Sequence, residues 1–139
     1  MTTLSDFFKW DPARLGLEIR EMDDGHKVLV DLMNRLHTAH EAGARVSEQI
    51  HILGDLLAAT RKHFAEEEVY MERIGFPGLR IHRGVHVQLL DKLAHYHASA
   101  KAQQVISDDL FMFFKMWLSA HICGIDSKYA QHAKTARSA

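Results

Sequence analysis

The segment Arg61–Leu90, RKHFAEEEVYMERIGFPGLRIHRGVHVQLL, places two pairs of metal-binding residue types on either side of a predicted turn. His63 and Glu67 precede the turn, whereas His82 and His86 follow it. Four residues advance an α-helix by about 400° and about 6 Å, so the members of each pair point the same way from adjacent turns. The GFPG sequence between the pairs favours a short loop, which makes the two helices antiparallel neighbours. The segment therefore predicts that two pairs of nitrogen and oxygen ligands face one another.

The composition is that of an ordinary soluble globular protein, with 47% apolar and 25% charged residues in a chain of 139. We expect one domain over residues 1–139. A formal net charge of -1 gives no general attraction for nucleic acid or anionic membranes. No secretory signal is visible, and the most apolar run, Leu110–Leu118, is too short to span a bilayer. We therefore expect a cytoplasmic protein without a membrane span.

Apolar residues at intervals of three and four predict four long helices, at about 23–41, 47–74, 79–101 and from 108 onward. Asp23 or Asp24, Ser47 and Ser107 are the predicted caps, and Gly43 follows the end of the first helix. No alternating run of valine and isoleucine predicts a strand. Because the links are short, we predict an all-α, up-down-up-down four-helix bundle at about 22–131.

The two ends of the chain fall outside this pattern. Pro12 and Gly16 interrupt the aromatic N-terminal segment, so we predict an ordered arm over 1–21 that lies along the body and over one end of the bundle. The polar tail from Ala130 to Ala139 is short, and we expect it to fray.

Each predicted helix carries histidine on its buried face, and the second also carries a glutamate. These residues are His26, His63, Glu67, His82, His86 and His121. A single buried histidine often only hydrogen-bonds to a backbone carbonyl. Five of them with a carboxylate are different, because each unsatisfied buried imidazole costs roughly 1–3 kcal/mol and the carboxylate costs more. A domain with about 5–15 kcal/mol of net stability needs bound metal to compensate for that cluster.

The number and type of ligands narrow the choice of metal. Five imidazoles and a carboxylate exceed what one tetrahedral zinc ion needs, so two ions that share bridging oxygens fit better. Nitrogen and oxygen ligands without thiolate suit iron, manganese or zinc. The lone Cys123 excludes an internal disulfide and a thiolate-rich site, and no base shares its helix face to make it a nucleophile.

Spacing ranks the carboxylates on the second helix. Relative to His63, Glu67 lies about 40° round the helix, Glu66 about 60° the other way and Glu68 about 140° away. Glu67 is therefore the favoured ligand and Glu66 the alternative. Glu68 is expected either to be solvated or to contact a metal ligand without binding the metal itself.

Spacing gives a different answer for Asp126 on the fourth helix. Asp126 follows His121 by five residues, about 140° off its face on a straight helix. Spacing alone therefore rejects Asp126, unless the helix bends or restarts near Cys123–Gly124.

Four segments in this order resemble the hemerythrin family, in particular its bacterial single-domain members. The segments are MDDGH (Met22–His26), HFAEEEVYM (His63–Met71), GFPGLRIHRGVH (Gly75–His86) and WLSAHICGIDSKY (Trp117–Tyr129). The resemblance implies a four-helix bundle that holds two iron ions bridged by an oxo or hydroxo group and two carboxylates. It assigns the iron ligands to His26, His63, Glu67, His82, His86, His121 and Asp126. It also implies a break in the fourth helix that lets Asp126 reach the metals, whereas Gly25 departs from the usual glutamine or glutamate.

The resemblance also implies a function. With six-coordinate irons, the ligands and a bridging hydroxide leave one position open for dioxygen, beside an apolar pocket. The pocket residues that match are Leu29, Phe64, Trp117, Leu118 and Ile122. We expect reversible dioxygen binding rather than catalysis, for storage, for delivery to an oxygen-using enzyme, or for sensing through a signalling partner. The alternatives are a di-iron oxidoreductase acting on peroxide, nitric oxide or ferrous iron, and an iron- or oxygen-responsive interaction protein.

Overall fold

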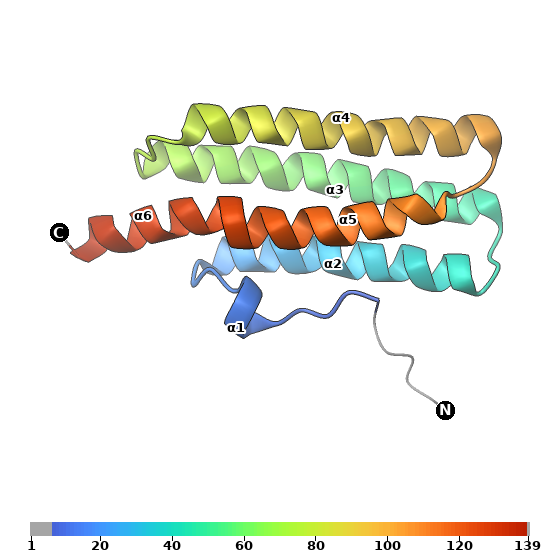
Figure 1. Cartoon of the computed structure of the whole chain (residues 1–139), viewed down its shortest axis with the longest axis horizontal. Coiled ribbons are helices and arrows are strands. Elements are labelled where there is room, and N and C mark those ends of the chain that lie inside the picture. The colour runs from blue at the N-terminus through green and yellow to red at the C-terminus, as the bar shows by residue number, and fades with distance from the viewer. Residues whose placement is uncertain (1–6, 139) are drawn as a thin grey trace.

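The computed structural model describes residues 7–138, and this part of the chain forms helices and no strand. The bundle consists of four long helical rods. Three of them are single helices, namely α2 (Arg20–Glu41), α3 (Val46–Arg73) and α4 (Leu79–Gln103). The fourth rod consists of α5 (Asp108–Ala120), the π-helix η1 (His121–Asp126) and α6 (Ser127–Ser138), which follow one another without a loop. Figure 1 shows the rods side by side with alternating direction. The predicted all-α, up-down-up-down bundle is confirmed, while the assignment of the whole chain to one domain stays a prediction.

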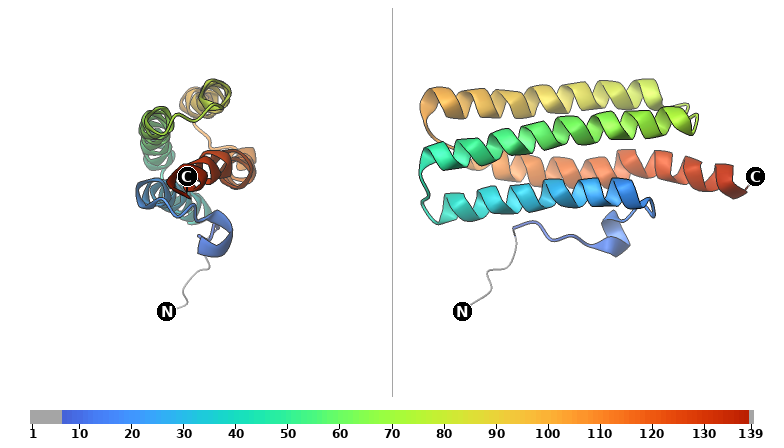
Figure 2. Two further views of the ribbon diagram at one scale, coloured as in Figure 1. Left: turned by 90° about the vertical axis from the view of Figure 1, so that its left-hand side faces the viewer. Right: turned by 180° about the vertical axis from the view of Figure 1, so that it is seen from behind.

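Two glycines and a serine define ends of the rods. Gly43 after α2 and Gly75 after α3 have φ of 71° and 66°, a left-handed conformation that glycine adopts without a steric penalty. Ser107 caps α5 as predicted, because its side chain accepts a hydrogen bond from the backbone N–H of Asp109 at 3.2 Å. Short links of this kind keep successive rods antiparallel and adjacent (Figure 2).

The predicted caps of the first two rods are wrong. α2 begins before Asp23 and Asp24, and the carboxylate of Asp23 instead accepts a hydrogen bond from the backbone N–H of Leu17 at 2.8 Å. The side chain therefore fastens the preceding arm to the helix. α3 begins at Val46, so Ser47 lies inside the first turn.

The described part of the N-terminal arm is ordered and contains the short helix α1 (Pro12–Leu15). The backbone of Phe8 exchanges two hydrogen bonds of 2.8 Å with the side chain of Asn34 on α2. Lys115 on α5 donates to the carbonyl of Phe7 at 2.9 Å. These contacts confirm an arm along the body, but it lies beside α2 and α5 and not over one end of the bundle. Its first residues, 1–6, lie outside the described part of the chain.

The predicted fraying of the C-terminal tail is wrong for the described residues, because α6 continues to Ser138. Tyr129, Ala130 and Ala133 are buried, and a ring nitrogen of His132 lies 3.2 Å from the carbonyl oxygen of Ile74. The small and aromatic residues of this face thus fix the helix against the bundle. Only residue 139 of the predicted tail lies outside the described part.

The core has an apolar half and a polar half. Near the end of α2 and the start of α3, it is filled by fully buried residues such as Met33, Leu36, Leu53 and Leu56. Near the start of α2 and the end of α3, the buried positions include five histidines, one glutamate and one aspartate. No helix within residues 7–138 has the length and apolar character needed to cross a membrane.

Candidate metal centre

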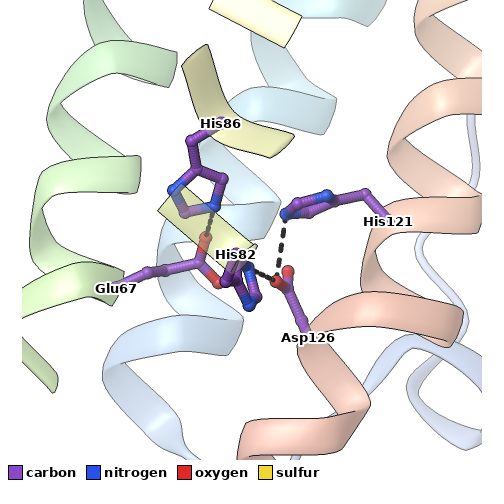
Figure 3. Close-up of side chains that lie close together, drawn as sticks. All are labelled: Glu67, His82, His86, His121 and Asp126. Carbon is purple, nitrogen blue, oxygen red and sulfur yellow. Dashed lines mark ion pairs between the residues drawn. The ribbon is translucent and has the colours of Figure 1, made fainter. Parts of the chain in front are cut away.

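Seven buried polar side chains from all four rods converge in the polar half of the core, and five of them are drawn in Figure 3. None is more than 3% exposed. They are His26 on α2, His63 and Glu67 on α3, His82 and His86 on α4, and His121 and Asp126 on η1. The structure therefore brings together all seven residues that the resemblance assigned as iron ligands.

The cluster has two halves that share Glu67. One group consists of Glu67, His82, His86, His121 and Asp126, and the other of His26, His63 and Glu67; in each group the ligand atoms lie within 4.8 Å of one another. Oδ1 of Asp126 lies 2.9 Å from Nε2 of His82 and 3.0 Å from Nε2 of His121, whereas Oδ2 lies 2.9 Å from Nε2 of His26. The two oxygens of Asp126 thus face different halves.

Glu67 also contacts imidazoles of both halves of the cluster. Its Oε1 lies 3.3 Å from Nε2 of His86 and 3.5 Å from Nε2 of His63, while its Oε2 lies 3.5 Å from Nε2 of His26. All five imidazoles therefore turn Nε2 toward a shared pair of carboxylates.

The π-helical turn explains how Asp126 reaches this cluster. A π-helix closes its hydrogen bonds from residue i to i+5, so its turn is wider than that of an α-helix and residues five apart lie on nearly the same face. η1 begins at His121 and ends at Asp126, which matches this interval. The α-helix is interrupted around Gly124, as expected, but by a π-helical turn and not by a break in the helical backbone. A straight α-helix would turn Asp126 away from the cluster, because its angle per residue is larger than that of a π-helix.

Most polar atoms of the cluster have no hydrogen-bond partner in spite of their closeness. Both ring nitrogens of His26, His63 and His121, Nε2 of His82 and of His86, Oε1 of Glu67 and both oxygens of Asp126 are buried and unsatisfied. Such a set is rare, since each group costs roughly 1–3 kcal/mol. Two ligand atoms each about 2.1 Å from one ion, at right angles to one another, lie about 3 Å apart. The spacings of 2.9–3.5 Å fit ligands that turn toward shared ions.

Electrostatics keep both carboxylates ionised. Burial raises the pKa of Glu67, but the adjacent imidazoles of His26, His63 and His86 outweigh it and hold this pKa well below the usual 4.5. Burial and Glu67 raise the pKa of Asp126, but His121 and His26 outweigh them and lower it. Ionised carboxylates are the form that binds cations.

Two side chains outside the cluster hold its members in place. Burial, followed by the charges of Glu67 and Asp126, raises the pKa of the Tyr129 phenol, which therefore keeps its proton. Its hydroxyl donates to Oε2 of Glu67 at 2.6 Å. The sequence reasoning missed this contact, although Tyr129 follows Asp126 by three residues and so shares its helix face.

Glu68 contacts a proposed metal ligand and is not itself part of the cluster, which is one of the two positions expected for it. Its carboxylate accepts a hydrogen bond from Nδ1 of His86 at 2.9 Å and another from Nε of Arg83 at 3.1 Å. Glu66, the alternative ligand, is exposed and lies outside the cluster. Glu67 is therefore the one glutamate of the three in the cluster.

The five predicted pocket residues, Leu29, Phe64, Trp117, Leu118 and Ile122, each lie within four residues of a cluster histidine along the chain. All are fully buried except Trp117, which is partly buried. The ring of Phe64 stacks on His86 with centroids 3.8 Å apart, and Trp117 stacks on His121 at 5.5 Å. These contacts place an apolar wall against the imidazoles. The remaining histidines and Cys123 are at least partly exposed, as expected.

The comparisons with known proteins agree with this geometry. The family model described as the hemerythrin HHE cation binding domain matches residues 17–133. A bacteriohemerythrin of Stenotrophomonas maltophilia is 31% identical over 124 residues, which cover 89% of this chain and 79% of that protein. A myohemerythrin of Riftia pachyptila is 33% identical over 111 residues, covering 77% of this chain and 88% of the relative. A crystal structure of wild-type hemerythrin superposes with a TM-score of 0.83 at 28% identity, covering 89% of this chain and 95% of the other.

Proposed function

Because this chain belongs to the hemerythrin family, we propose that it binds dioxygen reversibly at a non-haem di-iron centre and is an oxygen carrier or sensor rather than an enzyme. The observation that carries the proposal is the set of buried, unsatisfied nitrogen and oxygen atoms that face one another across the bundle. Metal ions are the partners that such a set fits.

The two halves of the cluster assign a ligand set to each iron. One iron would be held by His82, His86 and His121, and the other by His26 and His63. Glu67 and Asp126 would contribute to both sites, because their oxygens face imidazoles from both halves. When bound, the iron pair supplies an open coordination position and two electrons that can be lent to dioxygen and returned.

The protein's own contribution to reversibility is to exclude water and to fix protons. The wall of Leu29, Phe64, Trp117, Leu118 and Ile122 is apolar apart from the indole N–H of Trp117, which is buried without a hydrogen-bond partner. A dry wall of this kind denies outside protons to a reduced oxygen species and so opposes irreversible oxidation. Tyr129 and Glu68 hold the orientation of Glu67 and His86 while dioxygen binds and leaves.

The histidine-rich ligand set also separates this site from catalytic di-iron centres. Oxygen-activating proteins of the ferritin-like type use mostly glutamates, which supply more negative charge to the metals. Here five imidazoles accompany two carboxylates. Storage, delivery to an oxygen-using enzyme and sensing through a partner are all compatible with this site, and the cytoplasmic location stays a prediction.

The proposal is tested by cycles of oxygenation. The protein is reduced under anaerobic conditions and exposed to oxygen, and its visible spectrum is followed as oxygen is removed again. An absorption band that appears and disappears over several cycles supports the proposal, and turnover of peroxide with a reductant should be almost absent. His82→Ala should abolish the band, whereas His51→Ala, at an exposed position on α3, should leave it unchanged. A protein that oxidises permanently at the first exposure is not an oxygen carrier.

A further inference from the structure

A hollow of about 300 Å³ lies on the surface between α2 and α3, directly outside one half of the cluster. Among its lining residues are Glu21, Asp24, Gly25, Lys62, His63 and Glu66. Of these, only His63 belongs to the proposed metal centre. The hollow therefore connects the surface with one specific ligand.

The rim of the hollow is predominantly acidic. Glu21, Asp24 and Glu66 contribute three carboxylates, against the single ammonium group of Lys62. Lys62 lies 3.9 Å from Glu66, and Arg20 lies 3.9 Å from Asp24, so both ion pairs are loose and exposed. Exposed pairs of this kind contribute only about 0–1 kcal/mol, which leaves the carboxylates available to a cation. Carboxylate oxygens are common protein ligands of hard divalent cations.

The floor of the hollow is the imidazole of His63. This side chain is 3% exposed, and neither of its ring nitrogens has a hydrogen-bond partner. Its Nδ1 lies beside Gly25, where a β carbon would stand only 2.2 Å away. Because Gly25 has no side chain, no β carbon separates this nitrogen from the backbone of α2. His63 thus contacts the hollow on one side and presents Nε2 toward Glu67, at 3.5 Å, on the other.

A second hollow reaches another ligand but has the opposite chemistry. It measures about 120 Å³ and is lined by His82 together with Phe76, Ile81, Val85, Ile125 and Lys128. Apolar walls and a positive charge disfavour a hydrated cation. Of these two hollows, the one over His63 is therefore the better route for a metal ion.

We propose that the hollow between α2 and α3 is where a divalent cation first binds on its way to the centre. The carboxylates of Glu21, Asp24 and Glu66 collect the ion and replace part of its water shell, and the unpartnered imidazole of His63 passes it inward. The inference rests on the di-iron centre proposed above and adds a loading route to it. The route affects only the rate of metal uptake. The number of ions bound at equilibrium does not change.

The test measures Fe²⁺ uptake by protein from which metal has been removed, under anaerobic conditions and by rapid mixing. The double substitution Glu21→Gln and Glu66→Gln should slow uptake by about tenfold, since a focused negative potential raises association rates by about 10–1,000-fold. The control is Glu41→Gln with Glu48→Gln, which removes the same charge from exposed positions at the opposite end of α2 and α3. It should load at the wild-type rate.

A substitution of opposite sign sharpens the test. Lys62→Gln removes the one cation of the rim and should speed uptake, and added salt should slow the wild type more than the double variant. Equal rates for the double variant and its control would overturn the inference, as would slower uptake by Lys62→Gln. The amount of iron bound at equilibrium and the reversible oxygen band of each variant are measured separately. A protein that binds two irons and oxygen normally but loads independently of the rim refutes only the loading route.

Discussion

Glu68 accepts a hydrogen bond from Nδ1 of His86 at 2.9 Å, while Nε2 of the same imidazole lies 3.3 Å from Glu67. The ring is therefore fixed in one orientation by a carboxylate on each side. A carboxylate behind a ligand histidine also makes the imidazole a stronger base and a better metal ligand.

Glu68→Gln should weaken iron binding by about 10–100-fold, because the amide keeps the size of the side chain but not its charge. Competition with a chelator measures this affinity. The matched control is Glu72→Gln, one turn along α3, which lies 3.8 Å from the same Arg83 but does not contact His86. Equal affinities for the two variants would show that the contact with His86 does not support the metal.

Gly25→Ala should remove metal from the half of the centre that contains His63. The added β carbon would lie 2.2 Å from Nδ1 of His63, so the imidazole must move away from its position. We expect iron to fall from about two ions per chain to about one, as measured by elemental analysis after loading with excess Fe²⁺.

Gly84→Ala is the control for this substitution. Gly84 is also a helical glycine, but a β carbon there has no neighbour within 4 Å. Alanine should therefore stabilise α4 by about 0.5–1 kcal/mol with full iron content. If Gly25→Ala behaved in the same way, His63 would not depend on the missing side chain.

His40 should make stability depend on pH at the far end of the bundle. Burial disfavours its charged form, but Nδ1 lies 2.9 Å from Oε1 of Gln49 and Nε2 lies 2.9 Å from a carboxylate oxygen of Asp108, and these hydrogen bonds raise its pKa above 6.5. The amide of Gln49 is oriented by its own donation to the carbonyl of Ala44 at 2.8 Å. Both neighbours of the ring thus accept, which requires the imidazolium form.

Because the pKa of His40 is higher in the folded protein than the 6.5 of the unfolded chain, His40 stabilises the fold fully at pH values below 6.5. This stabilisation is lost as the pH rises through the folded-state pKa. Asp108→Asn should therefore cost about 0.5 kcal/mol more at pH 6 than at pH 9, in urea unfolding of the same preparation. Asp109→Asn changes the same first turn of α5 without contacting His40, and its cost should be equal at the two pH values. A pH-independent cost for Asp108→Asn would contradict the assignment.

Removal of metal should destabilise the whole bundle. Without ions, the buried imidazoles and carboxylates lose the partners that offset their desolvation, as argued for their unsatisfied atoms. Chelation should lower the thermal midpoint by about 10 °C or more, at roughly 3 °C per kcal/mol for a chain of this size. Reloading with Fe²⁺ should restore the midpoint, whereas equal midpoints with and without metal would mean that the cluster is stable by itself.

The sequence was sufficient for the bundle and for most of the cluster, because both follow from α-helical periodicity. His63 with Glu67, and His82 with His86, share faces wherever the helix is regular, so their convergence could be predicted. Helical spacing alone rejected Asp126, since its position depends on a π-helical turn that the spacing rules do not include, and only the family resemblance assigned it to the site. The contact between Gly25 and His63 depends on the distance between two helices, which periodicity does not contain.

The errors at the ends of the helices have a common cause. Asp23 has the residue type of a cap, but it binds the backbone of Leu17 and fastens the arm to α2. The tail reads as polar, yet Tyr129 and Ala133 are buried against the bundle. In both cases tertiary contacts outweigh local preference.

The most direct test of the central claim is the iron content of protein expressed in iron-replete medium and purified without chelators. If the seven convergent side chains form a di-iron centre, elemental analysis should find about two iron ions per chain, and His82→Ala should hold fewer. One ion per chain, or none, in protein that is folded and fully helical would contradict the account.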